Sequence, residues 1–288
     1  MGKYYCLIAG LPSLSLDDSK LTYSVSEFRR ELDGVLAFGD KKLVDLFFLK
    51  FDNKNLLNFL QHPDSNWDER GRITRDTLKT LFDALKDGEK PPRNKQLPPY
   101  FMAFVKQYLN GLSMEEKPVS WEDRLSALYY DYAMKCSNGF VRDWFELNLN
   151  IGNMLTAIIC RKYGFDKAEY VVGNNEVAEA IRTSNARDFG LGDMVDYLPE
   201  LQRIAEEPDL MAREKKVDSL KWKWLDDGTF FKTFDIESVF AYLLKLEMIE
   251  RWVTLDKATG EKTFRDIVGA MKKGSGNALE EFKRNNNK

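Results

Sequence analysis

The chain has 288 residues, of which 43% are hydrophobic and 31% are charged, a composition typical of a folded globular protein. Its formal net charge of −3 argues against general nucleic-acid binding, because such proteins need a basic surface. The sequence has no apolar run of 18 residues, so we expect no transmembrane helix, and its start does not resemble a signal peptide. Three scattered cysteines suit a reducing cytoplasm and predict no disulfide framework.

The predicted elements of the first third are helices. Ser24 and Glu27 have the spacing of a capping box and predict a helix that starts after Ser24. Asp40 predicts the cap of a long helix that ends near Gln61. That helix is apolar on nearly every side, so we expect it to be buried inside the protein. A connector with four prolines, residues 89–99, predicts the end of this region.

The rest of the chain also predicts helices. In the middle, helices are expected from Pro99, from Ser120 and from Gly139, and the last of these is long and apolar. In the final third, a charged helix is expected to break at residues 226–228, and Asp235 predicts the cap of a last long helix. No segment alternates apolar and polar residues over a sustained stretch, so the sequence predicts an all-α fold.

The three long apolar helices share a polar pattern. Each carries two polar residues three positions apart, which places the pair on one face of the helix. The pairs are Asp52 with Asn55, Asn150 with Asn153, and Glu247 with Glu250. Successive pairs begin 98 and 97 residues apart, close to the 96 residues of one third of the chain. This spacing favours a threefold internal repeat.

Three passages in these helices resemble the C subunit of the V-type and A-type ATP synthases, whose counterpart in the eukaryotic vacuolar pump is the d subunit. Residues 52–56, Asp-Asn-Lys-Asn-Leu, are similar to an Asp-x-x-Asn-Leu step inside an apolar helix of that family. Residues 147–154, Leu-Asn-Leu-Asn-Ile-Gly-Asn-Met, contain the same kind of step. Residues 239–250, Val-Phe-Ala-Tyr-Leu-Leu-Lys-Leu-Glu-Met-Ile-Glu, are similar to the family's C-terminal helix. By this resemblance the chain is a divergent bacterial form.

The resemblance implies three similar helical lobes arranged as a funnel with pseudo-threefold symmetry. With the breaks in the sequence, the lobes would span residues 1–98, 99–199 and 200–274, followed by a disordered tail over 275–288. The implied function is a non-catalytic rotor subunit, one copy per complex, that couples the central stalk to the membrane proteolipid ring. Such a subunit needs no cofactor, metal, nucleic acid or membrane span, and it lies on the cytoplasmic face of the plasma membrane. It serves rotation-driven transport of protons or sodium ions.

Two other functions remain open: an all-α scaffold or regulatory adaptor unrelated to ATPases, and a helical enzyme with a buried carboxylate site. The six paired polar residues could fix helix packing through hydrogen bonds or line a socket that receives a stalk helix. Glu247 and Glu250 could instead form the acid pair of a hydrolase, although no second acid cluster supports one. The sequence has no phosphate-binding loop, and its one histidine, His62, supports neither a zinc site nor a catalytic triad.

An aromatic cluster precedes the last long helix. It consists of Trp222, Trp224, Phe230 and Phe231. Packing in the core is the ordinary explanation for such residues. A protein-contact patch is the alternative, because aromatic side chains are enriched at interfaces.

Overall fold

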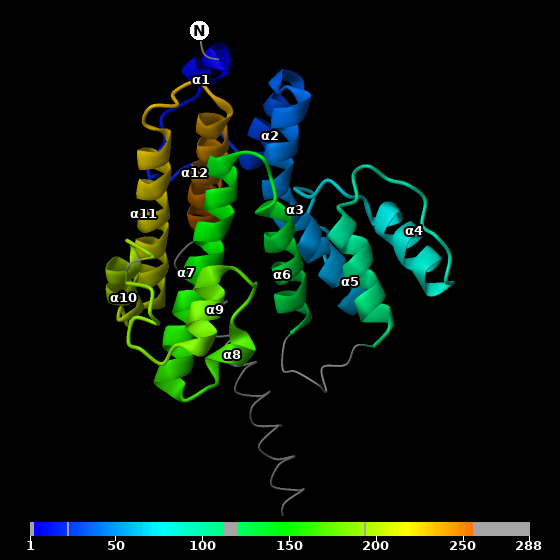
Figure 1. The fold of residues 1–288 in the computed structure, drawn as a ribbon. Coiled ribbons are helices and arrows are strands. Elements are labelled where there is room, and N and C mark those ends of the chain that lie inside the picture. The colour runs from blue at the N-terminus through cyan, green and yellow to red at the C-terminus, as the bar shows by residue number, and fades with distance from the viewer. Residues whose placement is uncertain (1–2, 22, 112–119, 193, 256–288) are drawn as a thin grey trace, which may run out of the picture.

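The computed structural model describes residues 3–21, 23–111, 120–192 and 194–255, and all regular structure in them is α-helical (Figure 1). The prediction of an all-α fold is therefore confirmed. Within these residues, no helix combines the length and the apolar character that crossing a bilayer requires. The tail expected over 275–288 lies outside the described residues.

Four helices make up the first part of the chain. They are α1 (Tyr5–Gly10), α2 (Val25–Val35), α3 (Phe38–Gln61) and α4 (Arg75–Lys86). The capping box predicted at Ser24 is present and begins α2. The predicted cap of the long helix is wrong, because α3 begins at Phe38 and contains Asp40 in its first turn. There Asp40 accepts hydrogen bonds from the side chains of Lys3 and Tyr4.

Five helices follow in the middle of the chain. They are α5 (Pro99–Leu109), α6 (Trp121–Ala133), α7 (Gly139–Tyr163), α8 (Lys167–Tyr170) and α9 (Glu176–Thr183). Asn138 caps α7 by accepting a hydrogen bond from the backbone N–H of Val141. The helix ends at Gly164, whose φ of 74° is a left-handed conformation that glycine adopts without strain.

Three helices complete the described chain: α10 (Leu198–Ala205), α11 (Leu210–Thr229) and α12 (Ile236–Thr254). The break predicted at residues 226–228 is wrong, because all three residues lie within α11. Gly228 allows close packing: a Cβ atom at this position would lie 2.7 Å from ring carbon Cε2 of Phe140. The glycine therefore serves the contact between α11 and α7 and does not end the helix.

The three long helices share one hydrophobic core. Phe48 on α3, Ile151 on α7 and Phe240 on α12 are all fully buried in a single continuous cluster. In Figure 1, α7, α11 and α12 stand side by side, and α4 and α5 lie on the opposite side of α3 and α6. This core runs through helices from all three predicted lobes. The lobe boundaries and the funnel arrangement stay predictions.

Candidate functional site

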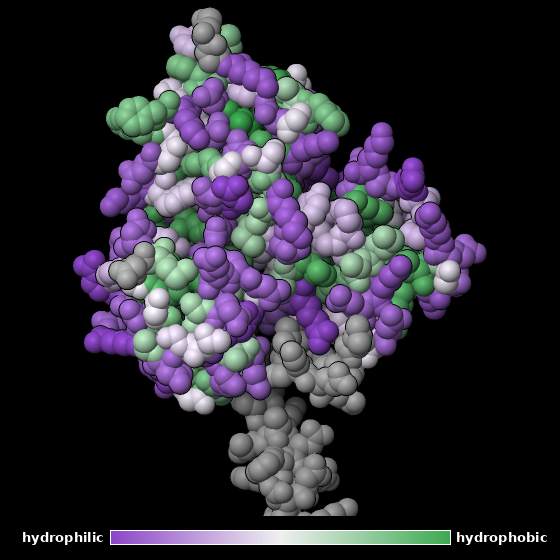
Figure 2. Space-filling view, viewed as in Figure 1, coloured by the Kyte–Doolittle hydropathy of each residue, from purple (hydrophilic) through white to green (hydrophobic). Residues whose placement is uncertain are grey.

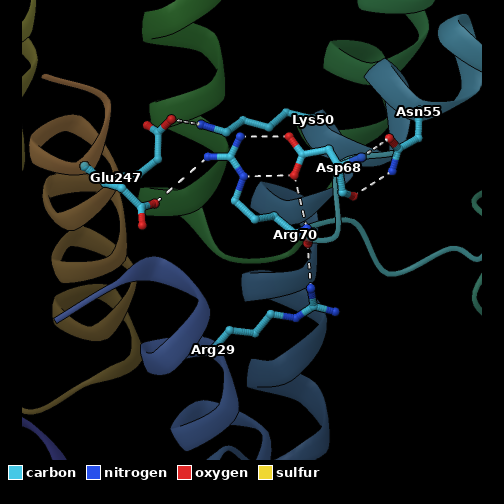
Figure 3. Close-up of polar contacts among 7 residues, drawn as sticks. Arg29, Lys50, Asn55, Asp68, Arg70 and Glu247 are labelled. Carbon is cyan, nitrogen blue, oxygen red and sulfur yellow. Dashed lines mark hydrogen bonds and ion pairs between the residues drawn. The ribbon is translucent and has the colours of Figure 1, made fainter. Parts of the chain in front are cut away.

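Asn55 on α3 fixes the loop between α3 and α4. Its buried side-chain amide makes two hydrogen bonds to one residue of the loop, Asp68. Oδ1 accepts from the backbone N–H of Asp68 at 2.9 Å, and Nδ2 donates to the Asp68 carbonyl at 2.9 Å (Figure 3). We call this two-way contact the first clamp. It gives the Asp68 N–H its acceptor and adds a second donor to the Asp68 carbonyl, which also accepts from the backbone N–H of Gly71 at 3.1 Å.

Asp52 lies one turn before Asn55 and holds the end of the same loop. It is completely buried, and its Oδ1 accepts hydrogen bonds from the backbone N–H groups of Arg72 at 2.7 Å and Ile73 at 2.9 Å. Thr74, the cap of α4, follows directly. Burial raises the pKa of Asp52 to about 6, because the low-dielectric surroundings disfavour the charged carboxylate.

The second clamp lies on α7 and repeats the first. Asn153 is buried, its Oδ1 accepts from the backbone N–H of Val172 at 2.9 Å, and its Nδ2 donates to the Val172 carbonyl at 2.7 Å. One turn earlier, Asn150 accepts a hydrogen bond at 2.8 Å from Asn175, which caps α9. In both clamps the later residue of the pair grips one loop residue. The earlier residue contacts the segment that leads into a later helix, α4 for Asp52 and α9 for Asn150.

The third polar pair, Glu247 and Glu250 on α12, contacts the first third of the chain. The Lys50 ammonium on α3 lies 2.5 Å from Oε1 of Glu247. Oε2 of Glu250 lies 4.0 Å from Nη1 of Arg70 in the α3–α4 loop. Oε2 of Glu250 is buried and has no hydrogen-bond partner among the described residues, and burial raises the pKa of this carboxyl group. The pair therefore joins the last long helix to the first third.

Opposite charges are matched around this contact (Figure 3). Arg70 binds the Asp68 carboxylate with two nitrogens, Nε at 2.9 Å and Nη2 at 2.8 Å. Arg29 on α2 donates to the carbonyl oxygens of Arg70 and Gly71. Burial lowers the pKa of Lys50, and the neighbouring Glu247 partly offsets that effect. The arrangement is suited to hold three segments together, because each cation bonds to a carboxylate or a main-chain oxygen.

The predicted aromatic cluster divides into two environments. Trp222 and Trp224 are half-buried, and Trp224 stacks on Phe140 with ring centroids 5.1 Å apart. Phe230 and Phe231, by contrast, are 73% and 92% exposed.

Phe230 and Phe231 belong to a larger exposed patch, which we call the aromatic end. We include in it three further exposed residues, Tyr5, Val35 and Phe38, whose chain segments come together here. The segments meet there because the N–H of Tyr4 bonds to the Phe234 carbonyl, and because the Tyr4 hydroxyl bonds to the N–H of Ala37. Figure 2 shows hydrophobic residues at this upper end of the molecule, which carries α1 and the α11–α12 connection.

A hollow of about 660 Å³ opens between α7, α9 and α11. Its lining includes Asn150, Tyr197 and Trp224, together with the carboxylates of Asp143, Glu146 and Glu176. Of the six paired polar residues, Asn150 is the one that lines it. Among the described residues, no group of three or more His, Cys, Asp or Glu side chains is arranged to hold a metal ion.

The chain matches the model of a family described as "Protein of unknown function (DUF2764)" over residues 1–275. It belongs to this family. No curated protein and no solved structure matches the chain.

Several residues of this DUF2764 member are absent from the sequence-based candidates. Lys50, Asp68 and Arg70 provide the contacts between the first clamp and α12. Asp218 on α11 is buried, and it binds Arg251 and, at 2.6 Å, the indole N–H of Trp252. For the contact of Asp218 with Arg251 and Trp252, the sequence offered one sign, an aspartate next to apolar positions of a predicted helix. The loop residues gave none, because their partners are set by tertiary structure.

Proposed function

We propose that this chain is the non-catalytic rotor subunit of a V/A-type ATPase, where it joins the central stalk to the membrane proteolipid ring. The observation that carries the proposal is the recurrence of the clamp on α3 and α7, formed in each case by the second residue of a polar pair. An internal repeat of helical units is what the resemblance to the ATP synthase family implies. A family relationship would account for the same contact at Asn55 and Asn153.

The packing is consistent with transmission of torque. A rotor adaptor must resist deformation, and a close-packed helical interior transmits strain. The pairs Lys50–Glu247 and Arg70–Glu250 connect α3 and its loop to α12, so a force on one of these helices reaches the other. Direct main-chain bonding at the clamps adds stiffness where loops would otherwise be free to move.

The aromatic end supplies a surface for a protein partner in the complex. Phe38 and Phe231 are among its most exposed side chains, and exposed aromatic groups at helix ends are typical anchors of protein interfaces. In the proposed complex the chain lies on the cytoplasmic face of the membrane and binds there through other subunits. The coupled transport is that of protons or sodium ions.

The contacts of the acid pair favour a structural role over hydrolysis. Glu247 is paired with Lys50, and Oε2 of Glu250 lies 4.0 Å from Nη1 of Arg70. A hydrolase would instead need both carboxyl groups facing a substrate. Hydrolytic activity of the purified chain that Glu250→Gln abolishes would support the enzyme alternative.

Affinity purification from membranes tests the proposal. The tagged full-length chain is recovered from gently solubilised native membranes, and its partners are identified by mass spectrometry. We expect the central-stalk subunits together with the proteolipid. Recovery of soluble partners alone, or of none, would overturn the rotor assignment and favour an all-α scaffold or regulatory adaptor.

A further inference from the structure

The two clamps differ in one ionisable group. The residue one turn before the clamping asparagine is Asp52 on α3 and Asn150 on α7. Both are buried. Oδ1 of Asp52 bonds to two backbone N–H groups, whereas its Oδ2 is buried without a hydrogen-bond partner among the described residues. A carboxylate in such a place bears a desolvation cost that an amide does not.

Asp52 forms no ion pair with the cations near it in the described part of the chain. Arg29, which approaches from α2, gives its guanidinium to the carbonyl oxygens of Arg70 and Gly71. Arg72 from the loop turns its side chain to Asp33 and Asp45. The titratable and charged groups that face Asp52 are Arg29 on α2, Asp68 and Arg72 on the loop, and Tyr100 on α5. The Asp68 carboxylate among them repels a negative charge at Asp52.

We propose that Asp52 is a proton-binding site that makes the first clamp sensitive to pH, while the second clamp, with Asn150, is insensitive. The folded chain takes up a proton at this carboxyl group on mild acidification. The proton removes a buried charge and leaves Oδ1 in place as the acceptor for the loop. Because the loop carries Arg70, which lies close to Glu250 on α12, the proton also stabilises the connection between the first and last long helices.

The sign of the effect follows from burial. The pKa of Asp52 is raised from 3.8 to about 6 in the folded chain. The folded state therefore binds the proton more tightly than the unfolded state, and the free energy of unfolding rises as the pH falls through this range. Burial also raises the pKa of Glu250, which acts in the same direction. Ion pairing lowers the pKa values of Asp33 and Asp68, which act in the opposite direction, so single variants must isolate Asp52.

A pair of reciprocal variants tests the inference on the full chain. Asp52→Asn gives the first clamp the amide of the second, and Asn150→Asp gives the second the carboxyl of the first. Urea unfolding is measured at pH 5 and at pH 7. For the wild-type chain relative to Asp52→Asn, we expect an unfolding equilibrium constant roughly tenfold smaller at pH 5 than at pH 7. Asn150→Asp should gain a dependence of the same sign.

Identical pH dependence in the wild type and Asp52→Asn would overturn the proposal. If a variant fails to fold, the carboxyl carbon signal of Asp52 in the wild-type chain, followed by nuclear magnetic resonance, provides the second measurement. A titration midpoint near 6 supports the site, and a midpoint near 4 contradicts it. Neither measurement involves ATPase partners, so the outcome is independent of the rotor proposal.

Discussion

The clamps on α3 and α7 form the same contact with different surroundings. In each, an asparagine holds both the N–H and the C=O of one loop residue, Asp68 or Val172. The position one turn earlier carries a carboxyl group in the first clamp and an amide in the second. In both clamps a side-chain oxygen at this position acts as an acceptor, for two backbone N–H groups in the first and for the Asn175 side chain in the second. A charge there adds pH dependence without being needed for the contact.

The third long helix uses the same spacing for a different purpose. Glu247 contacts the side chain of Lys50, and Glu250 lies close to that of Arg70, both in the first third of the chain. They therefore join two separate parts of the molecule, whereas the first clamp secures the connection between α3 and α4, and the second secures the one between α8 and α9. A polar pair on a buried helix can thus organise either a local loop or a distant contact.

Loss of the clamping amides should have the largest effect. Asn55→Leu and Asn153→Leu each remove two hydrogen bonds to a loop residue, and each leaves that residue's N–H without its acceptor. We expect each to reduce the free energy of unfolding by about 2–4 kcal/mol. Urea unfolding measures both variants. Asn148→Leu is the control, because the Asn148 side chain bonds only within α7, to the Trp144 carbonyl, and should cost less than about 1 kcal/mol. Equal losses of unfolding free energy in all three variants would show that the clamps stabilise the fold no more than a hydrogen bond within one helix does.

Substitution of the glycines beside the clamps should have the second-largest effect on stability. A Cβ atom on Gly71 would lie 2.6 Å from Oδ1 of Asp52, and one on Gly173 would lie 2.9 Å from Cδ2 of Leu149. Gly173 also has a φ of +80°, which strains other residues. We expect Gly71→Ala and Gly173→Ala to destabilise the fold by about 1–3 kcal/mol in thermal or urea unfolding.

Gly152 provides the matched control for these glycines. It lies inside α7, and a Cβ atom there would have nothing within 4 Å. Because alanine favours a helix, Gly152→Ala should stabilise the chain by up to about 1 kcal/mol. Destabilisation by this variant equal to that of Gly71→Ala would contradict the close approach at the first clamp.

The contact between α3 and α12 should have an intermediate effect. A double-mutant cycle with Lys50→Met and Glu247→Gln should give a coupling energy of about 1–2 kcal/mol, because the two side chains are partly buried. The exposed pair Lys135–Asp131, at the end of α6, is the comparison, and its coupling should stay below about 0.5 kcal/mol. Similar coupling energies in both cycles would show that the Lys50–Glu247 pair joins α3 to α12 no more strongly than an exposed surface pair would.

The smallest effect on stability is expected at the aromatic end. Phe231 is 92% exposed, so Phe231→Ser should change the free energy of unfolding by less than about 0.5 kcal/mol. In affinity purification from membranes, the same variant should recover less of the partner subunits than the wild type. Met102→Ser on α5, another exposed apolar position, should recover the wild-type amount. Equal recovery for both variants would exclude the aromatic end as a contact surface.

Much of the fold could be predicted from local signals. The capping residues Ser24 and Ser120 and the long apolar runs located the helices, because helix ends depend on nearby residues. The break predicted at residues 226–228 was wrong because Gly228 serves a contact with Phe140, which is distant in the sequence. Local patterns do not reveal such a contact.

The site was only half predictable. The polar pairs were visible, since a buried polar residue in an apolar helix needs a partner. Their partners were not, because Asp68, Arg70 and Val172 lie in loops whose positions depend on tertiary packing. Burial of Asp52 and the resulting rise in its pKa likewise required the surrounding helices.

A reconstruction by electron cryomicroscopy of a V/A-type ATPase from the organism that makes this chain would test the rotor assignment most directly. We expect one copy of the all-α fold, with α3, α7 and α12 sharing one core, between the central stalk and the proteolipid ring. A different protein at that junction, with this chain absent from the complex, would contradict it.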